Sequence, residues 1–239
     1  MGPTLPTYVG ALFQGADATG RPFCTASVVA SRRRNLVLTA AHCLDNRTAT
    51  DIVFVPGFDD GYIPHAVWHV NAAYLDPRWQ QDADPSADFA FLTVDDQTQS
   101  GKATSLQATV GGERLLARTA AGRRVHVVGR QVSVIGYPEG VHAHPIVCKS
   151  TVTAQTKKTT VQRKPKKVTK YIEYPRFNCN GYVDGTSGGP WLVSSATRSP
   201  FVVGVIGGWQ QGGNSAATSY SAPFGLDIAM LYRTATGAP

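Results

Sequence analysis

The chain has 239 residues, of which 42% are hydrophobic and 16% charged, and its formal net charge is +7. This length and hydrophobic content suffice to bury the core of one large domain or two modest ones, which excludes an intrinsically disordered chain. No apolar run approaches the roughly 18 residues that a membrane-spanning helix needs, so we expect no membrane span.

Short segments rich in β-branched and aromatic residues recur along the chain, separated by Gly, Pro, Asn or Asp. This pattern is typical of an all-β protein. The predicted strands are Tyr8–Phe13, Phe23–Ala30, Leu36–Thr39, Ile52–Val55, Phe89–Val94, Val125–Val128, Val132–Tyr137, Ile146–Thr153, Trp191–Ser194 and Phe201–Ile206. The polar span Asp95–Arg124 separates two strand-rich halves. Apolar residues at helical spacing over Leu226–Tyr232 predict a short C-terminal helix, capped near Asp227.

Seven of the 23 Lys and Arg residues lie between Lys157 and Lys170, in a run without an acidic residue. With those seven set aside, 16 basic residues balance the 16 acidic ones, so the net charge describes one segment and not the whole surface. Because aromatic residues do not interleave this run, we interpret it as a solvated hairpin or a mobile loop. The alternative is that Lys157–Lys170 contacts a polyanion, with salt-sensitive retention.

The four cysteines lie as one pair beside a histidine, Cys24 and Cys43, and one pair in the second half, Cys148 and Cys179. Neither pair has the Cys-x-x-Cys spacing of a metal site. Three pairings are possible, and the local one, Cys24–Cys43 with Cys148–Cys179, closes moderate loops worth about 3 kcal/mol each. Disulfides favour an oxidising, extracellular setting, whereas the alternative is four buried free thiols.

Three segments carry residues suited to nucleophilic catalysis. Ser187 lies in the glycine-rich turn Gly185–Pro190, where backbone N–H groups can converge on an oxyanion. His42, within Thr39–Cys43, is a candidate general base. Asp88 directly precedes an apolar run that would anchor it, and its carboxylate could orient the histidine. Together these residues predict a serine hydrolase.

Two other classes of site fit parts of the pattern. Gly185–Gly189 matches the Gly-x-Ser-x-Gly nucleophile elbow of α/β-hydrolases, but that fold places its histidine after the serine, and all six histidines here precede Ser187. Two histidine pairs have spacings that suggest metal: His65 with His69, and His142 with His144. No further ligand is evident in the sequence, so we interpret these as surface histidines and expect neither a metal nor a cofactor.

The segments Thr39–Cys43, Asp88–Leu92 and Gly185–Pro190 resemble the three signature blocks of chymotrypsin/trypsin-like serine proteases, in that family's order. Within the family, the chain looks most like the secreted bacterial branch. The resemblance implies two six-stranded antiparallel β-barrels, residues 1–118 and 119–239, followed by a short C-terminal helix. The active site would lie in the cleft between the barrels.

By the same resemblance, His42 is the general base, Asp88 the orienting acid and Ser187 the nucleophile of an endopeptidase that works through an acyl-enzyme. The N–H groups of Gly185 and Ser187 would form the oxyanion hole. Cys24–Cys43 would be the disulfide beside the histidine. The resemblance therefore implies a role for each residue of the predicted site.

The chain departs from the family at several positions. Thr186 replaces the aspartate that pairs with a freshly cleaved N-terminus in many animal members, so we expect an active fold without that ion pair. Gly181 replaces the aspartate of the trypsin pocket, so cleavage after Arg or Lys is not implied. The residues implied to bind substrate are Gly181, Tyr182, Asp184, Ile206, Gly207, Gly208 and Trp209. Gly207 stands where the family often has a serine bonded to the triad carboxylate, which leaves Asp88 to backbone donors.

A rival interpretation is a protease-like protein that has lost catalysis and binds polyanions through residues 157–170. The presence of His42, Asp88, Ser187 and Gly185 argues against it. We therefore expect a secreted, monomeric serine endopeptidase whose partners are protein or peptide substrates.

Overall fold

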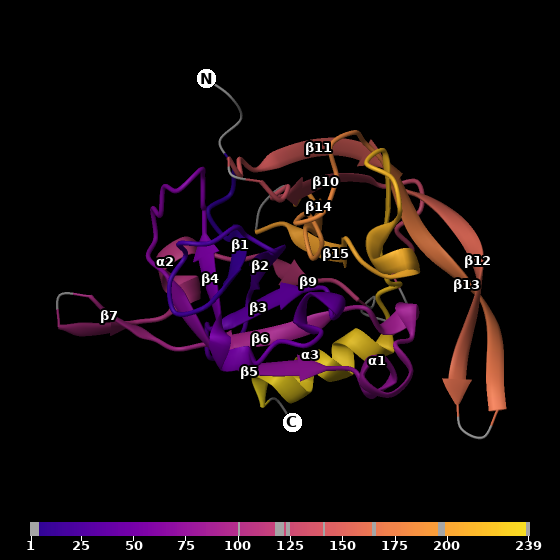
Figure 1. Ribbon diagram of the computed structural model, residues 1–239, viewed down its shortest axis with the longest axis horizontal. Coiled ribbons are helices and arrows are strands. Elements are labelled where there is room, and N and C mark those ends of the chain that lie inside the picture. The colour runs from indigo at the N-terminus through magenta and orange to yellow at the C-terminus, as the bar shows by residue number, and fades with distance from the viewer. Residues whose placement is uncertain are drawn as a thin grey trace.

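The first half of the chain forms a closed barrel of six antiparallel strands (Figure 1). The computed structural model describes residues 5–99, 101–117, 122, 125–140, 142–163, 166–195 and 199–237. In order around the barrel, the strands are β1 (Val9–Gln14), β2 (Cys24–Val29), β3 (Leu36–Thr39), β6 (Ala90–Val94), β5 (Trp68–Leu75) and β4 (Ile52–Pro56).

Most of these strands read as continuous apolar runs because both of their faces are buried. In β3, Leu36 and Leu38 point into a core cluster that also contains residues of the second half and of the C-terminal helix. Val37, between them, belongs to a second cluster formed by residues of the first half. Alternate side chains of one strand thus fill two cores, as the two-residue period of a strand requires.

The second half of the chain, together with one short strand from the span between the halves, forms two sheets. The five-stranded sheet has the order β11 (Ile146–Thr151), β10 (Gln131–Gly136), β14 (Pro190–Val193), β15 (Phe201–Val205) and β9 (Arg114–Leu115), and the three-stranded sheet has the order β12 (Thr153–Arg163), β13 (Lys166–Asn178) and β16 (Thr218–Tyr220). Phe177 packs edge-on against Trp191, 5.0 Å between ring centroids, and so links the two sheets. The predicted all-β class is confirmed. β9 precedes residue 118, yet it pairs in parallel with β15 of the second half. The division of the chain into two barrels at residue 118 therefore stays a prediction.

Helices are short and lie outside the sheets. The helices are α1 (Pro77–Asp82), α2 (Leu106–Val110) and α3 (Leu226–Thr236), and the 3₁₀ turns are η1 (His42–Leu44), η2 (Ala49–Asp51), η3 (Pro85–Ala87) and η4 (Trp209–Gly212). Two further strands, β7 (Gln97–Gln99) and β8 (Lys102–Thr104), pair with each other. α3 is the predicted C-terminal helix, and it buries Ile228 and Leu231 against the barrel. Its N-cap is Gly225. Among the described residues, no helix is long and apolar enough to cross a membrane.

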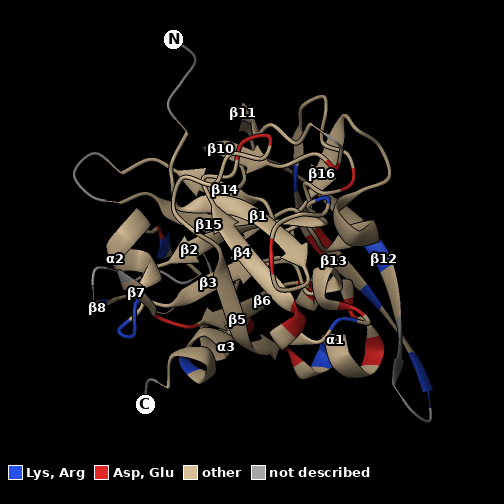
Figure 2. Ribbon diagram, turned by 60° about the vertical axis from the view of Figure 1, so that its left-hand side comes forward, with Lys and Arg blue, Asp and Glu red and all other residues tan. Residues whose placement is uncertain are grey.

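β12 and β13 form a long hairpin that reaches away from the closed barrel (Figure 1). Their register runs from Thr153 opposite Arg176 to Arg163 opposite Lys166. The run Lys157–Lys170 therefore lies in a hairpin, and blue segments along this arm mark its described Lys and Arg residues in Figure 2. Residues 164 and 165 lie outside the described residues.

The predicted strand Val125–Val128 is wrong. Val125 and Val127 are buried in the core of the second half, which explains their apolar character. However, Gly129 begins to reverse the chain at once: the N–H of Arg130 donates to the carbonyl of Val127, at 3.0 Å. The N–H of Val125 donates to the carbonyl of Ala117 at 3.3 Å, but among the described residues no strand pairs with this segment, so burial alone explains its strand-like sequence pattern. β5, by contrast, was missed because polar residues interrupt it on its exposed side.

Candidate active site

His42 is held at the end of β3 by a short turn and a disulfide. It begins η1, and the next residue, Cys43, is bonded to Cys24 on β2. The second disulfide joins Cys148 to Cys179, so the chain has the local pairing of its four cysteines. The first bond fixes the backbone next to the histidine against β2.

Asp88 lies between η3 and β6, and its side chain is fully buried. Its Oδ2 atom accepts a bond from His42 Nδ1 at 2.9 Å and from the N–H of Gly208 at 2.7 Å. Its Oδ1 atom accepts from the backbone N–H of His42 at 3.0 Å. Backbone donors thus surround the carboxylate at the place where Gly207 provides no hydroxyl. A Cβ at Gly207 would lie 3.1 Å from Asp88 Oδ2.

The charge of Asp88 controls the titration of the histidine. Burial by itself would lower the pKa of His42, but the Asp88 charge and its hydrogen bond outweigh burial, so the pKa is raised above 6.5. The indole N–H of Trp79 donates to Asp45 beside the same ring, which lies 6.5 Å from the indole. The arrangement favours an imidazole whose Nδ1 carries a proton and whose Nε2 is free to accept one.

Ser187 lies in a turn that Thr25 of β2 clamps to the first barrel. The N–H of Thr25 donates to the carbonyl of Ser187 at 2.8 Å, and its hydroxyl donates to the carbonyl of Gly185 at 2.9 Å. The same hydroxyl accepts from the N–H of Tyr137 at 2.8 Å. Thr25 is fully buried. Three segments far apart in sequence therefore meet at one hydroxyl group.

Gly185 adopts a conformation that only glycine takes without strain. Its φ is +86°, and a Cβ would collide with the backbone of Tyr137 and Glu139. Within the described part of the chain, the N–H groups of Gly185 and Ser187 have no acceptor, whereas those of Thr186, Gly188 and Gly189 are bonded to carbonyls. Two N–H donors, one on each side of Thr186, are therefore free in the turn that carries Ser187.

The structure does not close the last link of the predicted triad. Considering only the described residues, no hydrogen bond joins Ser187 Oγ to His42. Gly188 nevertheless lies against the chain next to the histidine, because a Cβ there would be 3.0 Å from the N atom of Ala40. The hydroxyl–imidazole contact of such sites often tightens only when substrate binds.

A cavity of about 520 Å³ opens beside Ser187. Of the residues predicted to bind substrate, Tyr182, Asp184 and Ile206 line it. Gly181, Gly207, Gly208 and Trp209 are not among its lining residues. The sequence did not predict the remaining wall, which is formed by Arg21, Glu139, Val183, Thr186, Gln211, Gly212, Gly213, Asn214, Ser215, Ala216 and Ser219. The hydroxyl of Tyr182 points away from the cavity, since it donates to the carbonyl of Val134 at 2.7 Å.

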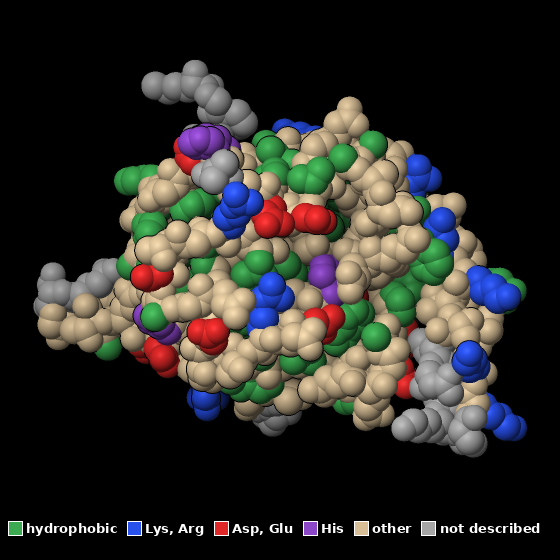
Figure 3. Space-filling model, viewed as in Figure 1, with side chains coloured by type: hydrophobic (Ala, Val, Ile, Leu, Met, Phe, Trp, Pro, Cys, Tyr) green, Lys and Arg blue, Asp and Glu red, His purple; other side chains and the backbone are tan. Residues whose placement is uncertain are grey.

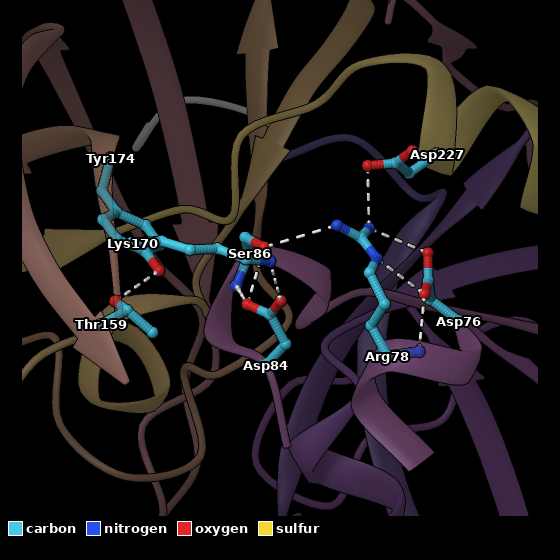
Figure 4. Close-up of polar contacts among 8 residues, drawn as sticks. All are labelled: Asp76, Arg78, Asp84, Ser86, Thr159, Lys170, Tyr174 and Asp227. Atoms are coloured by element: carbon cyan, nitrogen blue, oxygen red, sulfur yellow. Dashed lines mark hydrogen bonds and ion pairs between the residues drawn. The ribbon is translucent and has the colours of Figure 1, made fainter. Parts of the chain in front are cut away.

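A polar network holds the segment that leads into Asp88 (Figure 4). Asp84 is fully buried and caps η3, accepting from the N–H of Ser86 at 3.0 Å and from its hydroxyl at 2.7 Å. Lys170 of the hairpin neutralises this carboxylate, with Nζ 3.1 Å from Asp84 Oδ2. Arg78 of α1 reaches Ser86 from the other side. The hairpin thereby contacts the loop that carries the predicted orienting acid.

Sequence reasoning missed Thr25, Asp84 and Lys170. Thr25 follows Cys24 in a predicted strand that is otherwise largely apolar, and a hydroxyl there was a signal that it has a polar partner. Asp84 had the Asp-Pro-Ser sequence of a helix start. The lysine partner is 86 residues away, and local sequence contains no signal for it.

These features define the class of the protein: a chymotrypsin-like serine protease, with a His–Asp pair and a clamped serine turn where two β-rich halves meet. Residues 24–205, more than half of the chain, match the family described as trypsin-like peptidase domain. The chain belongs to that family and is a trypsin-like serine endopeptidase. No curated protein matches its sequence significantly.

Solved structures share the fold. The protease Anisep from Arthrobacter nicotinovorans is 23% identical, with a TM-score of 0.71 over 97% of this chain and 96% of its own. The thermostable serine protease AL20, from an extremophilic microorganism, is also 23% identical, with a TM-score of 0.71 over 98% of each chain. A Glu endopeptidase in complex with MPD is 16% identical, with a TM-score of 0.64 over 97% of this chain and 91% of its own.

Proposed function

We propose that the enzyme cleaves peptide bonds through His42, Asp88 and Ser187. Ser187 Oγ attacks the scissile carbonyl carbon while its proton passes to Nε2 of His42. The carbonyl oxygen becomes an oxyanion that accepts bonds from the N–H groups of Gly185 and Ser187. His42 then gives its proton to the departing amine, and water, activated by the same imidazole, hydrolyses the acyl-enzyme ester.

One observation carries this proposal. The turn that holds Ser187 has two N–H groups without an acceptor among the described residues, and the same structure contains a buried contact between His42 and Asp88. An N–H donor that no carbonyl of the described residues uses is available to bond the oxyanion that forms at Ser187. Loss of one such donor typically costs 10²–10³-fold in turnover.

The cavity beside Ser187 is the proposed binding site for the residue before the cleaved bond. Tyr182, Asp184 and Ile206 would contact that side chain directly. Gly181 and the segment Ile206–Trp209 would shape the surroundings and the approach of the substrate chain. Asp184 and Glu139 give the mouth of the cavity negative charge, partly offset by Arg21.

Replacing Ser187 by Ala tests the proposal. We expect a folded protein without peptidase activity, and we expect a fluorophosphonate probe to add one adduct, at Ser187, to the unaltered chain only. Peptide hydrolysis that persists in purified Ser187→Ala, or a probe adduct elsewhere, would refute the nucleophile assignment. A peptide library would then measure the residue preference.

Two disulfides support a secreted, extracellular enzyme, because such bonds persist in oxidising compartments. We expect it to act as a monomer. Elution in gel filtration at the volume of a 25.5 kDa chain would support this, and a larger species would oppose it.

A polyanion contact through the hairpin is a second proposal, and the structure narrows it. Lys170 is paired with Asp84, and Lys157 lies over the rings of Trp209 and Tyr220, at 5.4 and 5.5 Å. Other basic side chains of this arm are exposed, namely Lys158, Lys166 and Lys167, and blue side chains mark it at the right of Figure 3. Reversing these three charges should weaken salt-sensitive retention on an anionic resin, and unchanged elution would oppose the contact.

A further inference from the structure

Two histidines and two aspartates meet at the surface where the two halves of the chain approach each other. His142 and His144 lie between β10 and β11, and Asp59 and Asp60 lie between β4 and β5. The pairs come together although the bonded residues are 82 and 85 positions apart. The backbone supports the contact, since the N–H of Asp60 donates to the carbonyl of Ala143 at 3.3 Å.

Asp60 lies between the two imidazoles. His142 Nδ1 is 3.1 Å from Asp60 Oδ1, and His144 Nε2 is 3.6 Å from Asp60 Oδ2. Ligand atoms bound tetrahedrally to one zinc ion at about 2.0–2.1 Å are roughly 3.3 Å apart. One of the two nitrogen–oxygen distances is slightly shorter than this value and the other is slightly longer. Each nitrogen is therefore close to the carboxylate, although the ligand atoms of the three residues do not all lie within 4.8 Å of one another.

Asp59 completes an arrangement found around metal-binding histidines. Its Oδ1 atom lies 2.6 Å from His144 Nδ1, which fixes the ring and directs Nε2 towards Asp60. A histidine that binds a metal through one nitrogen commonly donates its other N–H to a carboxylate in this way.

We propose that His142, His144 and Asp60 bind a divalent transition-metal ion of the zinc class, with Asp59 orienting His144 as a positioning residue. Imidazole nitrogen suits zinc and its neighbours, whereas calcium and magnesium take oxygen ligands. The fourth position is open to water. The chain sequence offered only the two histidines, and the fold adds the two carboxylates.

The ion closes the site rather than entering a preformed cage. Among the described residues, one group of three potential ligands has all its ligand atoms within 4.8 Å of one another, and it consists of Cys24, His42 and Cys43. Both of those sulfurs are in the disulfide. His142 is 77% exposed, so its ring is free to turn towards the ion. We therefore expect binding weaker than in a structural zinc site.

The site would tie two loops that belong to different halves of the protein. The loop with His142 and His144 starts at Tyr137, and the N–H of Glu139 in it donates to the carbonyl of Asp184 beside the nucleophile turn. A bound ion would brace this loop. The inference does not depend on the proposed catalytic mechanism.

Calorimetric titration with Zn²⁺ tests the site in the full chain carrying Ser187→Ala, which prevents self-cleavage. We expect one ion per chain, at least tenfold weaker binding in His142→Ala, His144→Ala and Asp60→Asn, and about tenfold weaker binding in Asp59→Asn. His69→Ala is the matched control, because His69 is an exposed histidine on β5, and its affinity should not change. Ca²⁺ should give no heat of binding.

Thermal unfolding gives a second readout, since Zn²⁺ at a hundredfold excess over its Kd should raise the Tm of the unaltered site by about 5–10 °C. Metal-free melting of each variant shows whether it folds. Three results would each overturn the proposal: no Zn²⁺ binding, unchanged affinity after both His142 and His144 are replaced, or binding that disappears only in His42→Ala.

Discussion

Glu113 is a carboxylic acid that the fold buries completely, and it makes a quantitative prediction about stability and pH. Its Oε1 atom accepts a bond from the hydroxyl of Ser27 at 2.6 Å, and within the described residues its Oε2 atom has no partner. Burial raises the pKa of Glu113 to about 8 from 4.5, although the bond from Ser27 lowers it. The folded protein therefore holds a proton there that the unfolded chain releases near neutral pH.

Because the folded-state pKa is the higher one, the contribution of Glu113 is fully present below pH 4.5 and is lost as pH rises through about 8. Between these values, the free energy of unfolding should fall by up to about 1.4 kcal/mol per pH unit, or about 5 kcal/mol in total. Glu113→Gln removes the titration and keeps an acceptor for Ser27. The difference in free energy of unfolding between Glu113→Gln and the unaltered chain should therefore be about 3 kcal/mol more favourable to the variant at pH 7 than at pH 4.5.

Urea unfolding at pH 4.5, 6, 7 and 8, followed by tryptophan fluorescence in the Ser187→Ala background, measures this difference. Glu173→Gln is the control, since Glu173 is an exposed carboxylate on β13. The free energy of unfolding of this variant should differ from that of the parent by the same amount at every pH. A Glu113→Gln difference that is flat, or that shrinks with rising pH, would refute the reasoning.

Three further variants test the candidate site. Asp88→Asn should lower kcat by about 10⁴-fold; it also removes the charge that raises the pKa of His42, so the acid limb of kcat/KM should move to lower pH. Thr25→Val keeps the shape of the side chain but removes the clamp, and we expect a 10²–10³-fold loss of kcat with little change in KM, because the oxyanion donors lose their position. Lys170→Met leaves the buried carboxylate of Asp84 unpaired, so unfolding free energy should fall by about 3 kcal/mol at pH 7, and less at low pH, where that carboxylate is protonated.

Each of these variants has a matched control. Asp95→Asn replaces a surface carboxylate on the same barrel and should leave the pH profile unchanged. Thr153→Val alters an exposed threonine. Lys158→Met removes an exposed charge from the same hairpin as Lys170. An unshifted acid limb in Asp88→Asn, full kcat in Thr25→Val, or equal stabilities of Lys170→Met and Lys158→Met would contradict the corresponding prediction.

The sequence predicted what local patterns encode. Asp88 was chosen because it precedes an apolar strand, and the structure does place it against His42. The clamp by Thr25 and the Lys170–Asp84 pair were not predictable, because each depends on how strands distant in sequence come to lie side by side. The strand expected at Val125–Val128 failed for the opposite reason: burial gave the segment a strand-like composition, but within the described residues no strand pairs with it.

The hydroxyl of Thr25 belongs to one half of the molecule, and the serine turn that it holds belongs to the other. Hydrolysis therefore requires the two halves to stay in register, and a slight separation would misalign the donors and loosen the core that the halves share, while the strands of each half stayed paired. Heating should then inactivate the enzyme before either half unfolds. Loss of turnover would therefore report separation of the two halves at a lower temperature than a spectroscopic signal of unfolding.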